Sequence, residues 1–197
     1  MRYNELTFQG RNAVLEAFRS GKTIDKLFIL DGCQDGPIKS IVREAKKTDA
    51  IINYVDKERL DRLAGTGHHQ GVVAIGAAYE YAEVEDILAA AKEKGEDPFI
   101  FILDEIEDPH NLGAIIRTAN LAGAHGVIIP KRRAVGLTAT VAKTSAGAIN
   151  YTPVAKVTNI ANTIEALKKE GLWFVCADMG GETMYNLDLK GPIGLVI

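Results

Sequence analysis

The second half of the chain carries four short and nearly continuous apolar runs. They are FIFILD (99–104), GVIIP (126–130), LWFVCAD (172–178) and IGLVI (193–197). Runs of this kind are typical of strands that are covered on both faces. Between them, apolar residues recur at helical spacing in 112–122, 138–146 and 159–170. The alternation of buried strands with helices predicts an α/β domain with a parallel sheet built from βαβ units.

The first half of the chain has a more mixed pattern. Strands are predicted at 25–30, 51–55 and 71–77, and helices at 11–19, 37–47 and 56–63. Asp56 stands at the start of the last of these helices, where aspartate is a favoured N-cap. This half is therefore predicted to form a separate, small α/β domain.

A short amphipathic segment stands between the two halves. In YAEVEDILAAAKEKGEDP, Val84, Ile87, Leu88 and Ala91 have helical spacing, and Gly95 and Pro98 follow as stop signals. Residues 81–97 also hold six acidic and two basic residues. We therefore predict a first domain over 1–80, a linker helix over 81–97 and a second domain over 98–197.

Composition narrows the class of protein. Of 197 residues, 47% are hydrophobic and 25% charged, as in ordinary globular domains. The net charge of −3 does not indicate a polyanionic partner. Any binding of nucleic acid must therefore depend on a local cluster of basic residues. Cys33 and Cys176 form no Cys-x-x-Cys or Cys/His pattern, which argues against a zinc site or disulfide scaffold and favours a reducing cytoplasm. No apolar run approaches about 18 residues, which argues against membrane insertion.

The stretch from Asp104 to Ala119 is the strongest candidate for chemistry. It follows a buried strand and opens a helix, so it lies at the carboxyl end of the predicted sheet. Asn111 is a good N-cap there, and Gly113 permits close approach of a partner. Arg117, six residues later, could bind a phosphate or carboxylate as a fork. The alternative is that Asn111 only caps the helix and that Arg117 pairs with an acidic residue of the preceding loop, Glu105 or Asp108.

The segment NLGAIIRTA (111–119) closely resembles the first signature of the SpoU (TrmH-like) group of SPOUT RNA methyltransferases. The resemblance covers nearly the whole chain. FQGRNAV (8–14) and HQGV (69–72) look like the signatures of the N-terminal RNA-binding domain of many members, which is similar to ribosomal protein L30e. TSAGA (144–148) and TPV (152–154) match the middle region of the family. The resemblance is strongest to the branch of 23S rRNA guanosine 2′-O-methyltransferases.

The resemblance implies an L30e-like domain followed by a parallel-sheet SPOUT domain with an α/β trefoil knot, assembled as a homodimer. It implies transfer of a methyl group from S-adenosylmethionine to a ribose 2′-hydroxyl of RNA. Arg117 is then assigned to that hydroxyl or the adjacent phosphate, and Asn111 to support of the same site. Two alternatives stay open: a tRNA 2′-O-methyltransferase of the same family, and a non-catalytic RNA-binding module.

Other residues are candidates for RNA and donor binding. Arg11 and Asn12 at a helix start, the loop residues His69 and Gln70, and the cations Arg132 and Arg133 after strand 126–130 are assigned to RNA. His69 and Gln70 could instead hold the turn of the domain, and the arginines could be solvated surface. His68 and His69 have no further ligand cluster nearby, so no metal is expected. The loop of Ala177, Asp178, Met179 and Gly180 is the candidate donor wall, or else a plain turn.

The sequence stops on the apolar run 193–197. Members of the resembling family continue from this strand into a Gly-x-Glu-Gly loop and a Ser/Asn-rich segment that threads the knot and holds much of the methyl donor. We therefore expect the knot segment to be missing, the donor pocket to be incomplete, and the 197-residue chain alone to be inactive or nearly so.

Overall fold

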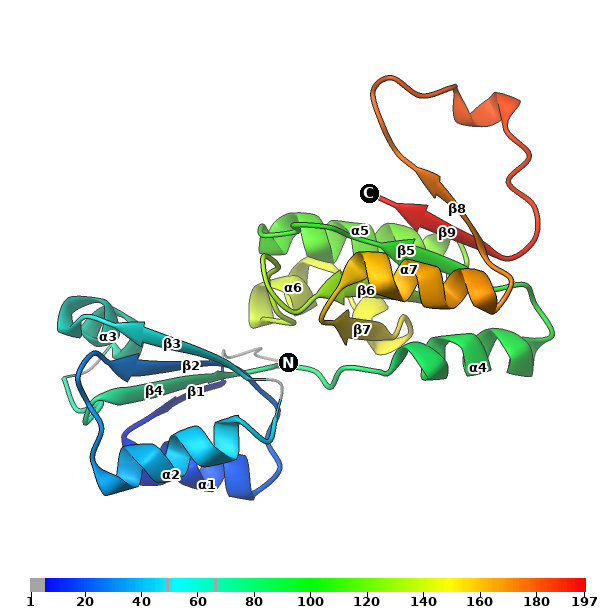
Figure 1. Cartoon of the computed structure of the whole chain (residues 1–197). Helices are drawn as coiled ribbons and strands as arrows, with labels where there is room; N and C mark the ends of the chain where they lie inside the picture. The colour runs from blue at the N-terminus through cyan, green and yellow to red at the C-terminus, as the bar shows by residue number, and fades with distance from the viewer. Residues whose placement is uncertain (1–5, 49, 66) are drawn as a thin grey trace. The chain divides into compact units, whose positions relative to one another are not determined.

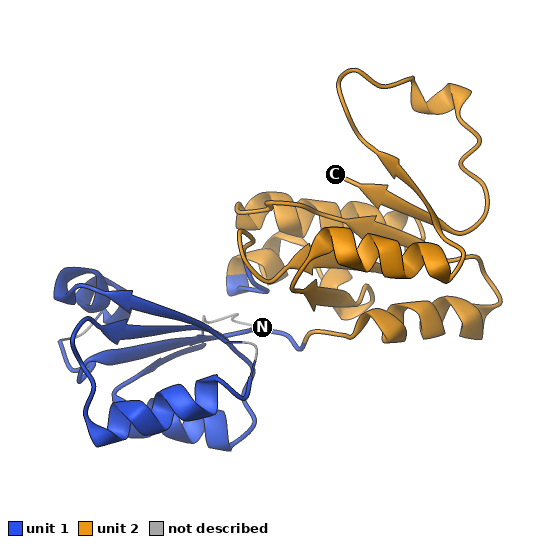
Figure 2. Ribbon diagram, in the orientation of Figure 1, with its two compact units in different colours: residues 1–80, 136–139 blue, residues 81–135, 140–197 orange. Residues whose placement is uncertain are grey.

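The computed structural model describes residues 6–48, 50–65 and 67–197, and it divides the chain into two compact units (Figures 1 and 2). Unit 1 runs to Glu80 and also takes in Gly136–Ala139. Unit 2 comprises Tyr81–Val135 and Thr140–Ile197. Each unit has its own sheet and its own apolar core, so each is an α/β unit, as the sequence predicts.

Unit 1 is built on a four-stranded sheet with the order β1-β4-β2-β3. β2 pairs in parallel with β3, whereas β4 runs antiparallel to both β1 and β2. Strand β1 was not predicted, because its four residues are half exposed and show little apolar pattern. The strands are β1 (Leu6–Gln9), β2 (Ile24–Leu30), β3 (Ile51–Val55) and β4 (Val72–Gly76).

In the described residues of unit 1, three helices cover this sheet. α1 (Arg11–Arg19) and α2 (Gly36–Ala45) lie on one face and share a core with β2, in which Val14, Leu27 and Ile41 are fully buried (Figure 1). α3 (Lys57–Ala64) packs through Leu60 against the opposite face. The predicted N-cap Asp56 is confirmed, since its carboxylate accepts a hydrogen bond from Arg59 N at 2.7 Å.

Unit 2 contains a five-stranded, wholly parallel sheet with the order β7-β6-β5-β9-β8. All four predicted apolar strands are present, and the short edge strand β7 is added to them. The central strands are the most deeply buried, with Ile100, Ile102 and Ile128 fully inaccessible. The strands are β5 (Phe99–Ile102), β6 (Gly126–Pro130), β7 (Val154–Val157), β8 (Trp173–Cys176) and β9 (Ile193–Val196).

The helices of unit 2 are α4 (Val84–Lys94), α5 (Pro109–Leu121), α6 (Ala139–Thr144) and α7 (Ile160–Lys169), with 3-10 turns η1 (Ala148–Asn150) and η2 (Met184–Asn186). α4 and α7 bury Ile87 and Leu167 in one core with the sheet. On α5, Leu112 and Ile116 are fully buried. α5, α6 and α7 match the three helices predicted after residue 98.

The segment 81–97 forms the predicted helix, but it is not a free linker. Ile87 of α4 is fully buried in the same core as Ile100 and Ile128, and Gly126 leaves the space that its side chain fills. The helix begins where Glu83 N donates to the Asp86 carboxylate at 2.9 Å, and it ends at left-handed Gly95. α4 is therefore part of unit 2, because its apolar face is buried on that sheet.

No helix in the described part of the chain is long and apolar enough to cross a membrane. Cys33 and Cys176 are both free thiols. The described residues contain no group of three or more histidine, cysteine, aspartate or glutamate side chains placed to hold a metal ion.

Candidate functional site

The loop between β5 and α5 lies at the carboxyl edge of the sheet of unit 2. Its last residue, Asp108, caps α5: its carboxylate accepts from His110 N at 3.2 Å and Asn111 N at 3.3 Å. Pro109 follows as the first helical residue, a position where its missing N–H costs nothing. The expectation that Asn111 is the N-cap is therefore wrong, because the Asp-Pro pair starts the helix earlier and leaves Asn111 in its first turn.

Asn111 and Arg117 are both exposed on α5. Six residues of α-helix separate them by about 9 Å along the axis and about 120° around it. The two side chains therefore leave the helix in different directions and do not contact each other. Because α5 begins at Pro109, Arg117 stands in its third turn, about 12 Å from the helix start. Arg117 is therefore about two turns from the first residue of the helix.

The Arg117 guanidinium has no hydrogen bond or ion pair with any residue that the structure describes. Of its two expected acidic partners, Glu105 pairs with Arg133 at 2.7 Å and Asp108 caps the helix. The alternative in which Arg117 is tied up in a surface ion pair is therefore wrong. An exposed guanidinium with its donors available can bind a phosphate or carboxylate as a fork.

Gly113 makes room for this chain's own α6 rather than for an external partner. A Cβ atom at Gly113 would collide with Thr144, whose hydroxyl also donates to Pro109 O at 3.3 Å. The segments NLGAIIRTA and TSAGA, which are far apart in the sequence, therefore pack against each other in unit 2.

The loops after β5 and β6 are joined to each other at the same sheet edge. Val135 N donates to Ile106 O at 2.8 Å, and the Arg133 guanidinium pairs with Glu105. Both members of that pair have left-handed backbones, with φ of 57° at Arg133 and 52° at Glu105. Strain of this kind is held only where the surrounding structure enforces it. Arg132 is exposed beside them, whereas Arg133 is already engaged by a carboxylate.

The candidate donor loop follows β8. Ala177 N continues the ladder to Val196 O at 2.9 Å, and Gly181 N donates to Asp178 O at 3.2 Å, so the backbone turns at this point. Ala177, Asp178, Met179 and Gly180 are all exposed. Strands β5 and β9 separate β8 from β6, so Asp178 and Arg132 share an edge but stand on strands about 14 Å apart.

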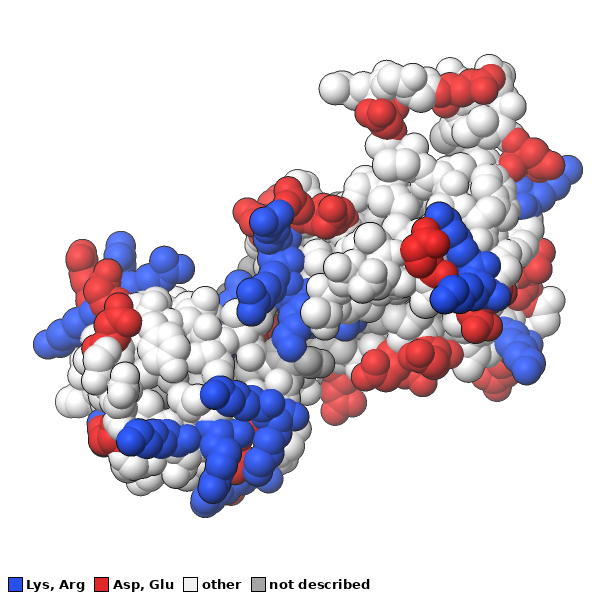
Figure 3. All heavy atoms as spheres, viewed as in Figure 1, with Lys and Arg blue, Asp and Glu red and all other residues white. Residues whose placement is uncertain are grey.

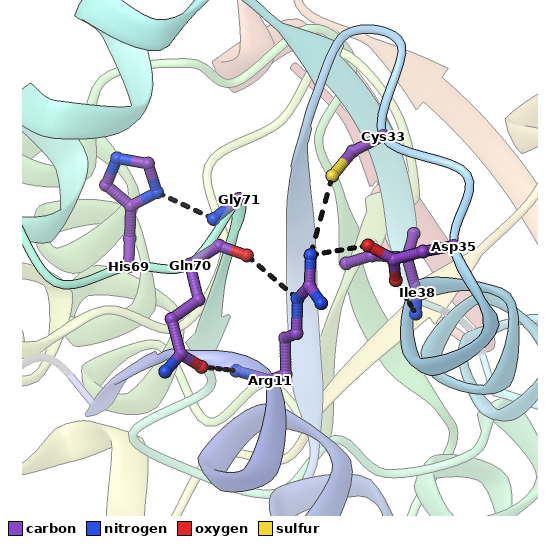
Figure 4. Close-up of polar contacts among 7 residues, drawn as sticks. All are labelled: Arg11, Cys33, Asp35, Ile38, His69, Gln70 and Gly71. Atoms are coloured by element: carbon purple, nitrogen blue, oxygen red, sulfur yellow. Dashed lines mark hydrogen bonds and ion pairs between the residues drawn. The ribbon is translucent and has the colours of Figure 1, made fainter.

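In unit 1, Arg11 is held by a turn that comes 59 residues later in the sequence (Figure 4). Arg11 N donates to Gln70 Oε1 and its Nε donates to Gln70 O, both at 3.1 Å. The guanidinium also donates to Asp35 Oδ2 at 2.5 Å and lies 3.8 Å from Cys33 Sγ. Gln70 adopts a left-handed φ of 51° to present both oxygens. Arg11 is therefore largely engaged within the protein, whereas its neighbour Asn12 is exposed.

His69 holds this turn from within. Its Nδ1 accepts a hydrogen bond from Gly71 N at 3.0 Å, which places the ring proton on Nε2, 2.8 Å from the Asp61 carboxylate. The His69 side chain is only 7% exposed. Of the two interpretations of His69, the structure favours the turn-holding one, since both ring nitrogens are occupied and the ring is buried.

Sequence reasoning missed three residues that organise this region: Cys33, Asp35 and Asp61. Asp35 also caps α2, accepting from Ile38 N at 3.2 Å. The sequence Asp35-Gly36-Pro37 is a recognisable helix start and could have identified this cap. The pairing of Asp35 with Arg11 and of Asp61 with His69 has no local signal, because it depends on how the strands and helices pack.

Two family models match the two halves of the chain. Residues 98–197 match the SpoU rRNA methylase family, and residues 9–82 match the substrate-binding domain of RNA 2′-O ribose methyltransferases. The two matches thus define an RNA methyltransferase with a separate substrate-binding domain.

Related proteins match this chain over nearly its whole length. A Bacillus subtilis protein described as a TrmH family tRNA/rRNA methyltransferase is 52% identical over 189 residues, 95% of this chain and 76% of that protein. A Staphylococcus saprophyticus protein with the same description is 47% identical over 98% of this chain and 78% of its own length. The chain therefore belongs to the SpoU, or TrmH, family of RNA methyltransferases.

Solved structures show the same fold. The SpoU methyltransferase AviRb from Streptomyces viridochromogenes, crystallised with AdoMet, is 20% identical with a TM-score of 0.54, covering 98% of this chain and 72% of that one. An rRNA methyltransferase from Sinorhizobium meliloti is 24% identical with a TM-score of 0.50, covering 96% and 70%. The trefoil knot implied by the family resemblance stays a prediction.

Proposed function

We propose that the protein transfers a methyl group from S-adenosylmethionine to a ribose 2′-hydroxyl of RNA, with a guanosine of 23S rRNA as its first candidate target. Membership of the SpoU family and the match of residues 9–82 to a ribose methyltransferase substrate domain support this activity. The observation that carries it is Arg117, an exposed guanidinium that has no partner among the described residues and stands on the helix that opens at the carboxyl edge of the sheet. Open α/β sheets bind their ligands at that edge.

Arg117 acts in this proposal as an anion clamp. Arginine stays protonated in proteins, so it does not serve as a free base for the 2′-hydroxyl proton. Its positive charge lowers the cost of developing negative charge on the ribose oxygen, and its fork can also fix the adjacent phosphate. Asn111, about 9 Å away along α5, offers an exposed amide that supports the same substrate from the helix start.

The loop from Ala177 to Gly180 is the proposed wall of the donor site. S-adenosylmethionine supplies an electrophilic methyl group there when it is bound. The residues fit a nucleoside: the exposed Asp178 carboxylate follows the end of β8 in a parallel sheet, where such groups accept hydrogen bonds from ribose hydroxyls. Met179 and Gly180 add an apolar side chain and an open backbone to the same wall.

The relatives' description as tRNA/rRNA methyltransferases supports one second candidate, a tRNA 2′-O-methyltransferase. Homodimer formation and a cytoplasmic location also remain part of the proposal. RNA contact by Asn12 and Arg132 is proposed from their exposure, whereas Arg11, His69 and Gln70 act first by shaping the turn.

The test uses methyl-labelled S-adenosylmethionine with unmodified 23S rRNA and, separately, total tRNA. Nucleoside mass spectrometry then locates the label on ribose or base. Ribose-labelled guanosine from 23S rRNA supports the proposal, and ribose label confined to tRNA supports the second candidate. Label on a base contradicts ribose methylation by this protein. So does RNA binding without any transfer in a chain that extends through the segment expected to complete the donor pocket.

A further inference from the structure

A surface hollow of about 420 Å³ lies beside α2 and the edge strand β3 of unit 1. No residue that the sequence assigns to RNA lines it. Its lining combines cations, short apolar groups and one aromatic ring: Cys33, Gln34, Ile38, Lys39, Val42, Arg43, Lys46 and Tyr54.

Three of the lining residues are cations: Lys39 and Arg43 on α2, and Lys46 at its C-cap. Lys39, Arg43 and Lys46 follow the i, i+4, i+7 spacing of a single helix face. None of the lining residues is acidic, although residues 1–80 hold 11 acidic and 12 basic residues. Figure 3 shows Lys and Arg gathered on unit 1 over α1 and α2. The lining of the hollow is thus positive, although the acidic and basic residues of 1–80 nearly balance.

The two carboxylates nearest in sequence are already engaged. Glu44 accepts from Lys47 Nζ at 2.8 Å, and this hydrogen bond lowers the pKa of the Glu44 carboxyl. Arg43 lies 3.9 Å from the same carboxylate and its side chain stays 73% exposed. Asp35 is taken by Arg11. The lining cations are therefore available to bind an external anion.

Tyr54 adds an aromatic surface to the hollow. It projects from β3, an edge strand of the sheet, and is 56% exposed. A ring beside a row of cations is the arrangement with which proteins bind single-stranded nucleic acid, because a free base stacks on the ring while its phosphates meet the cations. In a duplex the base faces are already stacked, so a duplex would use the cations alone.

We propose that this hollow binds a single-stranded segment of the RNA substrate, with phosphates on Lys39, Arg43 and Lys46 and one base stacked on Tyr54. The inference rests on the proposed function, which makes RNA the substrate. It adds a second contact region on unit 1, which adjoins the Arg11–Gln70 turn at Cys33. This region holds an unpaired stretch of the target.

The test measures fluorescence anisotropy of a labelled oligoadenylate of about twelve nucleotides over a range of salt concentrations. In the triple variant Lys39→Ala, Arg43→Ala, Lys46→Ala, the slope of log affinity against log salt should fall by about two units. Tyr54→Leu should weaken binding by about tenfold. On an abasic ribose-phosphate chain of equal length, Tyr54→Leu should change nothing, because no base is present to stack.

The matched control is Lys57→Ala, Arg59→Ala, Arg62→Ala, which removes three exposed cations from α3 of the same unit. Equal loss in both triple variants, unchanged binding in Tyr54→Leu, or tighter binding of an RNA duplex or of polyglutamate than of the oligoadenylate would overturn the proposal. If the unaltered protein methylates RNA and the hollow variants bind RNA as tightly as the unaltered protein does, the hollow has no role in RNA binding, while the proposed function still stands. If the unaltered protein binds no RNA, the proposed function itself fails.

Discussion

Gly113 of α5 lies so close to Thr144 at the end of α6 that no methyl group fits between them. The Thr144 hydroxyl is fixed there by Thr140 O at 2.9 Å and by Pro109 O at 3.3 Å, so it cannot easily move away. The helix that carries Asn111 and Arg117 is thereby held in place by a segment some thirty residues later, roughly one βα unit away.

Gly113→Ala should therefore destabilise the protein. Alanine is usually the better helix former, but the added Cβ overpacks the contact, and we expect the free energy of unfolding to fall by about 1 to 3 kcal/mol. Urea denaturation measures the change. Adding Thr144→Ala should recover part of the loss, because it removes the hydroxyl that meets the new methyl group. Strictly additive losses in the double variant would show that the two positions do not interact.

His69→Ala should also lower the free energy of unfolding, by about 1 to 3 kcal/mol, because it leaves the buried N–H of Gly71 without its acceptor. His68→Ala is the matched control: this neighbour is exposed, and its loss should matter by less than about 0.5 kcal/mol. Thermal and urea unfolding compare the two variants. Unchanged stability of His69→Ala, together with weaker RNA binding, would instead assign His69 to direct RNA contact.

Arg132 and Arg133 should differ in RNA binding although they are adjacent. Arg132→Ala should reduce the salt slope of RNA affinity by a little under one unit, as one phosphate contact is lost. Arg133 is neutralised by Glu105, so Arg133→Ala should have a smaller effect and Glu105→Gln should raise the affinity. Anisotropy titrations at several salt concentrations give these slopes. Identical slopes for both alanine variants would mean that the Glu105 pair does not survive in the RNA complex.

In the full-length protein, Arg117→Ala should lower methyl transfer by about 10² or more with little change in stability, the scale of a lost preorganised contact to the transition state. Arg117→Lys should recover little activity, since an ammonium cannot reproduce a bidentate fork. Single-turnover transfer to RNA measures both. Lys169→Ala, which removes an exposed cation from α7, serves as the charge control. Transfer near that of the parent in either Arg117 variant would leave this residue without a catalytic role.

The pKa of Glu44 should rise toward its usual value in Lys47→Gln, because the hydrogen bond from Lys47 is the main cause of its lowering. A carboxyl whose pKa is lowered in the folded state stabilises the fold above its unfolded pKa, and this contribution disappears as the pH falls through the folded value. Carbon-detected NMR titration of Glu44 checks the direction. Arg43→Gln should produce a smaller rise, since Arg43 contributes only a weaker charge effect.

The sequence by itself determined the elements that have a strong apolar period. The strands at 99–104, 126–130 and 193–197 and the helix at 81–97 were predictable because buried faces leave a repeating pattern along the chain. The position of the loop that follows β5 and ends at Asp108, at the carboxyl edge, followed from the order of strand and helix alone. Short edge strands such as β1 and β7 were missed, since four residues at an edge leave little pattern.

Only the tertiary structure decided which polar groups are free. Arg11 and Arg133 look alike in sequence to Arg132 and Arg117, yet the first two are held by Asp35, Gln70 and Glu105. Their partners lie 24, 59 and 28 residues away in the sequence, and no local sequence pattern indicates these pairings. The burial of apolar residues follows their spacing along a helix or strand, which can be seen in the sequence. A hydrogen bond or ion pair instead depends on the distance between segments that only folding brings together.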